Sequence, residues 1–149
     1  MALGNIFDIA GTGMNAQSLR LNTTASNLAN AQSASSSVDE VYRSRQPVFA
    51  AIQQDAIRQS MSEGAYSQNE LDANAGVQVK GIVESDAPLQ RRYEPTHPKA
   101  DKDGYVFYPN VNPVEEMTNM ISASRSFQMN VEVMNSAKQM VQRVLTLGQ

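Results

Sequence analysis

The strongest constraint on the fold is a long helical pattern that occupies residues 113–149. Asn112 and Pro113 form a typical helix start, because Asn is a favoured N-cap and Pro is tolerated at the first helical position. A helix of about 35 residues would be about 50 Å long, and such a helix needs a partner along its length. Its mostly apolar stripe recurs at alternating spacings of three and four residues, as in a coiled coil, through Met117, Met120, Ser124, Phe127, Val131, Met134, Val141 and Leu145. Lys138 interrupts this stripe, and we expect Ala137 to take its place in the seam.

The partner is expected at the other end of the chain, in residues 1–32. Phe7, Met14, Leu21 and Leu28 recur there at seven-residue spacing, which predicts a second helix with one narrow apolar seam. Small or polar residues fill the complementary positions, and two helical glycines cost about 1 kcal/mol each relative to Ala. This helix should therefore depend on a partner. We predict that 1–32 and 113–149 pair as an antiparallel coiled coil that forms a helical core domain.

The residues between the helices, 33–112, predict a small β-rich insert. Residues 46–52, 77–84 and 105–108 have the composition of strands, and Asp103-Gly104 predicts a turn before the last of them. Residues 54–76 are polar and irregular, which predicts a mobile loop or a short helix followed by a loop. The expected fold class is therefore mainly α with a small β-rich insert that contains a β-hairpin region and loops.

The open faces of both predicted helices carry few charges. In residues 1–32 only Asp8 and Arg20 are charged, and the positions outside the seam are mostly Asn, Ser, Thr and Gln. Burying an ion costs several kcal/mol unless it is paired, whereas amides and hydroxyls are tolerated when they are hydrogen-bonded. Such faces favour packing against further chains in a helical assembly. The alternative is a hairpin of two helices whose outer surface is rich in Asn and Ser.

The composition excludes several classes of function. The chain has no Cys, so disulfides, thiolate metal sites and Cys nucleophiles are absent. Its 12 basic and 15 acidic residues give a net charge of −3, which argues against nucleic-acid binding. No apolar stretch approaches the roughly 20 residues of a membrane span, so direct membrane insertion is not expected. No Lys or Arg precedes Arg20, so a cleaved Sec signal peptide is not predicted and export would need another route.

No catalytic, cofactor-binding or metal site is predicted. His97 is the only histidine and lies in a Pro-flanked loop, which fits neither a zinc site nor a Ser-His-Asp triad. A calcium loop aligned on Gly104 would begin at Lys99 and end at Asn110, where Asp and Glu are required. Arg91-Arg92 is too small a basic cluster for a phosphate site, and a strand-edge or surface role fits it better.

Several short blocks resemble bacterial flagellar axial proteins. The N-terminal blocks are Asn5-Ile6-Phe7-Asp8-Ile9-Ala10-Gly11, Gln17-Ser18-Leu19-Arg20-Leu21-Asn22 and Ala25-Ser26-Asn27-Leu28-Ala29-Asn30-Ala31. Downstream blocks resemble rod proteins of the basal body, above all Tyr93-Glu94-Pro95, Pro109-Asn110-Val111-Asn112, Ser122-Ala123-Ser124-Arg125-Ser126 and the ending Leu145-Thr146-Leu147-Gly148-Gln149. The resemblance covers residues 2–49 and 82–149.

The resemblance implies a structural subunit of the proximal flagellar rod, which transmits motor torque to the hook and filament. The implied partners are other rod proteins, further copies of the chain, basal-body ring and export-gate proteins at the rod base, and the flagellar type III export apparatus. The expected assembly interface combines the Asn27–Asn30 motif with both seams, namely Phe7, Met14, Leu21, Asn27, Leu28, Asn30, Met117, Met120, Phe127, Val131, Met134, Val141 and Leu145. The alternatives are another rod or hook-related axial protein, or a small hydrolase or metal-binding domain.

Overall fold

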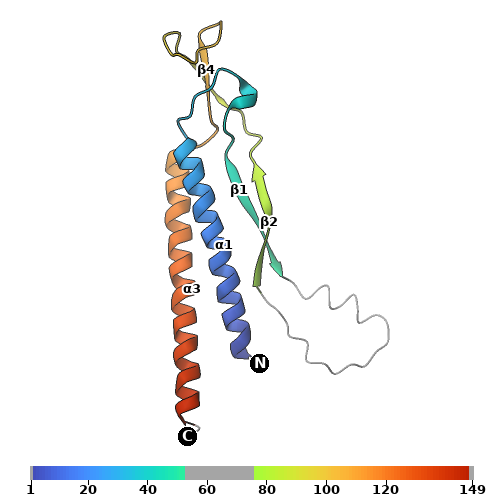
Figure 1. Ribbon diagram of the computed structural model, residues 1–149, viewed down its shortest axis with the longest axis vertical. Helices are drawn as coiled ribbons and strands as arrows, with labels where there is room; N and C mark the ends of the chain where they lie inside the picture. Colours follow the sequence, from blue (N-terminus) through green and yellow to red (C-terminus); the bar gives the residue numbers. More distant parts are fainter. Residues whose placement is uncertain (1, 53–75, 148–149) are drawn as a thin grey trace, which may run out of the picture. The chain divides into compact units, whose positions relative to one another are not determined.

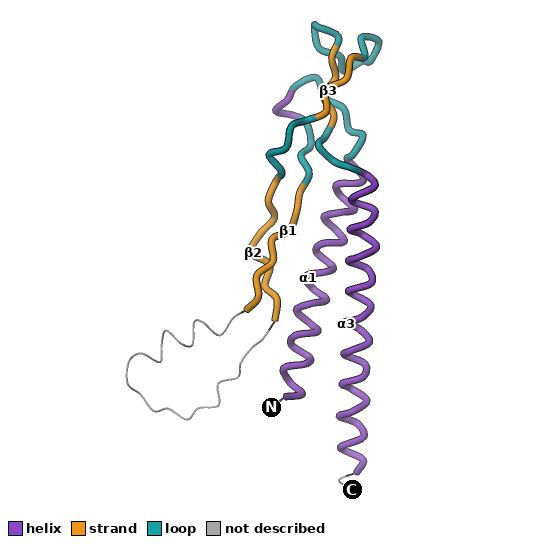
Figure 2. Tube along the Cα trace, turned by 180° about the vertical axis from the view of Figure 1, so that it is seen from behind, coloured by secondary structure: helices purple, strands orange, loops and turns teal. Residues whose placement is uncertain are grey.

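Two long helices dominate the computed structural model, which describes residues 2–52 and 76–147 (Figure 1). Helix α1 spans Ala2–Asn30 and helix α3 spans Pro113–Leu147, and the two pack together in antiparallel orientation (Figure 2). Between them lie the 3-10 helix η1 (Val38–Glu40) and four strands, β1 (Arg45–Ile52), β2 (Gly76–Glu84), β3 (Gln90–Tyr93) and β4 (Tyr105–Tyr108). The predicted fold class, mainly α with small β-hairpins between terminal helices, is confirmed.

The strands form two separate two-stranded sheets, β1–β2 and β3–β4. The predicted strands at 46–52, 77–84 and 105–108 correspond to β1, β2 and β4 within one residue at each end. Strand β3 was not predicted as a strand, because all four of its residues are exposed and give no alternation of apolar and polar residues. Except for Gly76, the predicted loop at 54–76 lies outside the described residues.

The chain divides into two compact units, each of which contains part of both helices and part of the β1–β2 hairpin. Unit 1 comprises Met1–Ser18, Phe49–Lys80 and Arg125–Gln149, and unit 2 comprises Leu19–Val48 and Gly81–Ser124.

Unit 1 has a core of small side chains. Ala10 and Ala16 of α1 and Ala137 of α3 are its buried apolar residues among those described. A Cβ atom added to Gly13 would lie 2.9 Å from the side-chain nitrogen of Asn130, so a glycine at this point lets α3 approach α1 closely. The backbone N–H of Val77 in β2 donates to the hydroxyl of α1 Thr12 at 3.2 Å, which attaches the hairpin to the helix.

Unit 2 has a small apolar core that is interleaved with buried polar side chains. Val41, Val106, Val111 and Ala123 are buried, as are Thr23, Thr24, Asn27, Ser35, Ser44 and Glu116. Strands β3 and β4 pair antiparallel with Arg91 opposite Phe107, and Phe107 also exchanges two backbone hydrogen bonds with Ser35 at 3.0 Å. Gly104 has a positive φ of 80°, which explains the glycine in the turn before β4.

Candidate assembly interface

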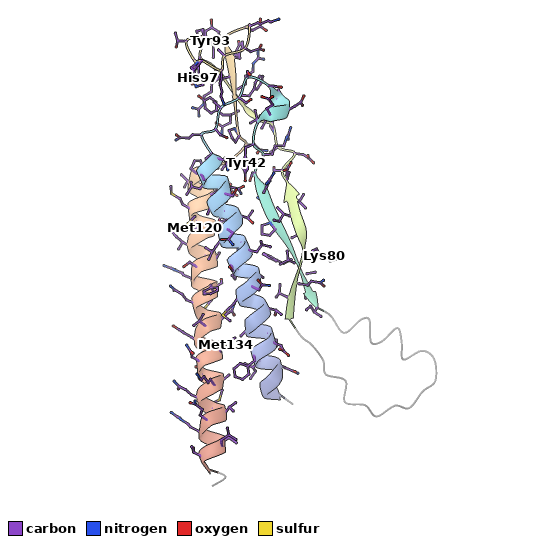
Figure 3. All side chains as sticks on the ribbon, in the orientation of Figure 1. Tyr42, Lys80, Tyr93, His97, Met120 and Met134 are labelled. Atoms are coloured by element: carbon purple, nitrogen blue, oxygen red, sulfur yellow. The ribbon has the colours of Figure 1, made fainter. Side chains whose placement is uncertain are left out.

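The contact between α1 and α3 differs in register from the predicted seam. Met120, Phe127, Met134 and Val141 are half-buried, as a seam requires, and Figure 3 shows Met120 and Met134 on α3. The inward positions between them, however, are Glu116, Ala123, Asn130 and Ala137. Taken together, the eight residues follow one another at alternating spacings of four and three.

The predicted seam is wrong at Met117 and Leu145, whose side chains are 51% and 67% exposed. Glu116 takes the inward position next to Met117, because its carboxyl is hydrogen-bonded to Asn27 of α1. Leu145 lies near the end of the 35-residue α3, which is longer than the 29-residue α1. The prediction that Ala137 rather than Lys138 occupies the seam is confirmed, because Ala137 is fully buried and Lys138 is exposed.

On α1 the predicted seam residues are half-buried, and smaller or polar residues between them are also buried. Phe7, Met14, Leu21 and Leu28 are all half-buried. Three interleaved positions follow the same seven-residue period, namely Ala10 and Thr24, which are buried, and Gln17, which has a buried side-chain oxygen. The most deeply buried positions between the helices thus hold small and polar side chains, and the large apolar residues beside them are half-buried.

Asn27 is the centre of a hydrogen-bond network inside unit 2, and its side chain is 0% exposed. Its Nδ2 donates to the backbone oxygen of Arg45 at 2.8 Å, to Glu116 Oε1 at 3.1 Å and to Ser44 Oγ at 3.4 Å. Its Oδ1 accepts from the Tyr42 hydroxyl at 2.8 Å and from the Arg45 backbone N–H at 2.9 Å. This one amide therefore joins α1, the first residue of β1 and the first turn of α3 within the subunit.

A second amide, that of Asn110, holds the base of the β1–β2 hairpin. Its Oδ1 accepts from the backbone N–H of Ser44 at 2.8 Å, and its Nδ2 donates to the backbone oxygens of Ser85 and Ala87 at 3.1 and 2.9 Å. Asn30, expected at the interface, is half-buried and donates to the backbone oxygen of Ser26 at 2.8 Å.

Glu116 is a buried acid next to this network, with an exposed fraction of 5%. Burial is the largest cause that raises its pKa above the ordinary value of 4.5, and the neighbouring Glu115 carboxyl raises the pKa further. The hydrogen bond from Asn27 and the charge of Arg20 act in the opposite direction. Arg20 itself donates to Asn119 Oδ1 at 2.9 Å, a further polar contact between α1 and α3.

Large apolar side chains are exposed on the outer faces of α3. Val114, Met117 and Ile121 form one stripe in unit 2, and Met129, Val133, Met140 and Val144 form another in unit 1. We call these seven residues the α3 outer stripes. Contiguous exposed apolar surface of this kind marks interaction sites on soluble proteins. Sequence reasoning placed only Met117 of this set at the interface, although the spacing of Met129, Val133, Met140 and Val144 by four, seven and four residues was a readable signal.

The loops carry no counterpart of a catalytic or metal centre in the described part of the chain. His97 Nδ1 accepts a hydrogen bond from the backbone N–H of Lys99 at 3.1 Å, which is a turn contact. Among residues 2–52 and 76–147 there is no cluster of His, Cys, Asp and Glu that could hold a metal ion. No helix in the same residues is both long and apolar enough to span a bilayer.

The β3–β4 hairpin stacks its arginines on aromatic rings. The Arg91 guanidinium lies 3.6 Å from the centroid of the Tyr105 ring, and that of Arg92 lies 4.9 Å from the centroid of Tyr108. The exposed strand-surface role expected for Arg91-Arg92 agrees with these positions. The Tyr108 hydroxyl donates to Glu94 at 3.0 Å, and this hydrogen bond is the main cause that raises the pKa of Tyr108.

Comparison with known proteins gives full-length relatives. Residues 7–32 match the family described as "Flagella basal body rod protein", and residues 102–147 match "Flagellar basal body rod FlgEFG protein C-terminal". The chain is 49% identical over 149 residues to the flagellar basal-body rod protein FlgC of Escherichia coli O6:H1 and 50% identical over 149 residues to that of Salmonella typhimurium, with 100% of both chains covered in each case. It is 36% identical over 155 residues to FlgC of Borreliella burgdorferi, covering 100% of this chain and 99% of the relative.

Proposed function

Because the chain belongs to the FlgC family of flagellar basal-body rod proteins, we propose that it serves in the proximal rod and carries torque from the motor to the hook and filament. The family is structural rather than enzymatic, and its members are subunits of the basal-body rod. The alternatives of a hydrolase or a metal-binding domain are therefore set aside.

The observation that carries this proposal is the pair of α3 outer stripes. A chain that functioned alone would place Met129, Val133 and Met140 inside, because each is about half exposed and forgoes about half of the roughly 1.5–3 kcal/mol that full burial contributes. A subunit whose helices are covered by neighbouring chains recovers that free energy on assembly. The low charge of α1, with Asp8 and Arg20 alone, makes the same burial possible on its other faces.

We propose that the assembly interface consists of the α3 outer stripes together with the flanks of the half-buried seam residues. On α1 these are Phe7, Met14, Leu21 and Leu28, and on α3 they are Met120, Phe127, Val131, Met134 and Val141. The half-buried Asn30 and the exposed Leu145 also belong to the proposed interface. Asn27 supports the interface from within, because its side chain is fully used inside the subunit. In this proposal residues 1–32 and 113–149 act as the helical core domain, and residues 33–112 are its insert.

The proposed partners are other rod proteins, further copies of this chain, and the ring and export-gate proteins at the rod base. Export through the flagellar type III apparatus is part of the same proposal. Both statements rest on the family to which the chain belongs.

The interface is tested by adding one charge to an outer stripe. Met129→Asp places a carboxylate where the proposal requires burial, whereas Gln128→Asp adds the same charge to the adjacent exposed residue of α3. In cells that lack their own copy of the gene, we expect Met129→Asp to abolish swimming and recovery in purified basal bodies. Gln128→Asp, which lies off the stripe, should retain both.

Secretion of both variants into the medium is the control for export. Equal secretion with loss of assembly only for Met129→Asp supports the interface. Normal swimming by Met129→Asp, or equal loss by both variants, contradicts the assignment of this stripe.

A further inference from the structure

We propose that Glu116 and Asn27 form a proton-sensitive lock, in which the uncharged carboxyl of Glu116 ties the first turn of α3 to α1 and to the start of β1. This inference concerns the subunit itself and is independent of how the subunit assembles. The lock comprises Glu116, Asn27 and the backbone of Arg45 that Asn27 holds.

The Glu116 carboxyl is buried with few hydrogen-bond donors around it. Its side chain is 5% exposed, and Oε1 has one donor, Asn27 Nδ2 at 3.1 Å. Oε2 is buried and has no hydrogen-bond partner among the described residues. An ionised carboxylate offers about four acceptor sites, and burying it with a single donor costs several kcal/mol. A protonated carboxyl in the same place costs far less.

None of the described basic residues makes an ion pair with the Glu116 carboxyl. The charged groups that shift its pKa are Glu115 on α3, which raises it, and Arg20 on α1, which lowers it. The Arg20 guanidinium donates to Asn119 rather than to Glu116, and the Arg45 guanidinium of β1 is paired with Glu84 of β2 at 2.9 Å. Between η1 and β1, the Tyr42 hydroxyl donates to Asn27 Oδ1.

Asn27 lies on α1 and contacts both the start of β1 and the first turn of α3. The amide that donates to Glu116 also makes a paired contact with Arg45, donating to its backbone oxygen at 2.8 Å and accepting from its backbone N–H at 2.9 Å. When the ionised Glu116 carboxylate moves into water, Asn27 Nδ2 loses this acceptor. The first turn of α3 then loses its hydrogen bond to Asn27 and is held less tightly. The effect therefore reaches α1 and β1 through a single side chain.

The pH dependence follows from the direction of the pKa shift. In the folded chain the pKa of Glu116 lies above the ordinary value of 4.5, mainly because of burial. The native state therefore binds this proton more tightly than the unfolded state does. The stability that the neutral carboxyl contributes is fully present below about pH 4.5 and is lost as the pH rises through the raised pKa.

The test compares urea unfolding of the full chain between pH 4.5 and pH 8 for the wild type, Glu116→Gln and Glu115→Gln. Gln keeps the shape of the side chain and cannot ionise, and Glu115 is the exposed neighbour that loses the same charge. We expect the unfolding midpoint of Glu116→Gln to rise relative to the wild type as the pH increases. The difference between Glu115→Gln and the wild type should change much less with pH, because Glu115 contributes less than burial does to the raised pKa of Glu116.

A second measurement keeps the inference testable if Glu116→Gln does not fold. Carbon-13 NMR of the wild-type carboxyl groups should show Glu116 titrating above 4.5, and the Arg45 amide proton should exchange faster once Glu116 has ionised. A Glu116 carboxyl that titrates at or below 4.5, or a midpoint difference between Glu116→Gln and the wild type that does not change with pH, overturns the lock.

Discussion

Replacing Asn27 by Ala tests how much of unit 2 depends on one buried amide. Four of its hydrogen bonds are 3.1 Å or shorter, to the backbone oxygen of Arg45, from the backbone N–H of Arg45, from the Tyr42 hydroxyl and to Glu116. A hydrogen bond of this kind contributes about 1 kcal/mol net, and a buried group left without a partner costs about 1–3 kcal/mol. The Tyr42 hydroxyl retains Ser26 Oγ at 3.3 Å, so it loses least.

The backbone oxygen and backbone N–H of Arg45 and the Glu116 carboxyl therefore set the size of the effect. We expect Asn27→Ala to lower the free energy of unfolding by about 3 kcal/mol, which is a large part of the roughly 5–15 kcal/mol of a typical domain. Asn27→Asp keeps the acceptor, removes the donor and places a second carboxyl next to Glu116. It should destabilise the chain increasingly as the pH rises and both carboxyls ionise.

The assay is urea unfolding followed by circular dichroism and tyrosine fluorescence. Asn22→Ala is the matched control, because Asn22 lies on the same helix and is exposed. Exposed substitutions are usually within about 0.5 kcal/mol of the wild type. If Asn27→Ala unfolds within that margin of Asn22→Ala, the network does not stabilise unit 2 and the reasoning from burial and hydrogen bonds is refuted.

Three further substitutions have predictable effects. Gly104→Ala should destabilise the chain by more than 1 kcal/mol in urea unfolding, because φ is 80° and the new Cβ would lie 2.9 Å from a tyrosine ring carbon, whereas Gly81→Ala has open space and should be nearly neutral. Gly11→Ala should raise helicity and stabilise by about 0.5–1 kcal/mol, since its Cβ would meet nothing within 4 Å; a loss of ellipticity would contradict this. Glu94→Gln should lower the pKa of Tyr108, measured by NMR titration, because the Glu94 carboxylate is the main cause that raises it; an unchanged pKa would contradict that cause.

The ends of the chain were predictable because their signals are local and strong. Asn112 caps α3 as expected, with its side-chain oxygen accepting from the Val114 backbone N–H at 3.1 Å. The seven-residue period of Phe7, Met14, Leu21 and Leu28 identified the second helix of the pair. The family motifs then indicated a flagellar rod protein, which the full-length relatives confirm.

The register of the helix pair was not predictable from hydrophobicity, because α3 carries more than one apolar stripe. A search for large apolar residues assigns Met117 to the seam as readily as it assigns a residue that does face α1. In the structure Glu116, rather than Met117, faces α1. Ala137 was the single position at which the sequence favoured the observed register, because Lys138 could not be buried. Applying that one-residue shift to the alternate positions Met117, Ser124 and Val131 alone would have given Glu116, Ala123 and Asn130 as well.

The hydrogen-bond partners of Asn27 were beyond sequence reasoning, since Arg45 and Glu116 are brought to it only by the fold. A motif rich in asparagine has the same appearance whether it faces a neighbouring chain or the interior. The burial of Asn27 shows that this residue faces the interior of the subunit, whereas Asn30, three positions later, is half-buried.

The distribution of residue sizes over α3 gives these observations one physical explanation. The inward positions of α3 hold alanines, an asparagine and an acid, which let two backbones approach, and the acid accepts a hydrogen bond from Asn27 at 3.1 Å. The large side chains Met129, Val133 and Met140 are about half exposed, so a single subunit gains only part of the free energy of burying them. A monomeric two-helix protein would be more stable with this arrangement reversed. An arrangement that leaves its most hydrophobic face open is therefore expected only where neighbouring chains close it, and the polar inner contacts then hold each subunit in register for that closure.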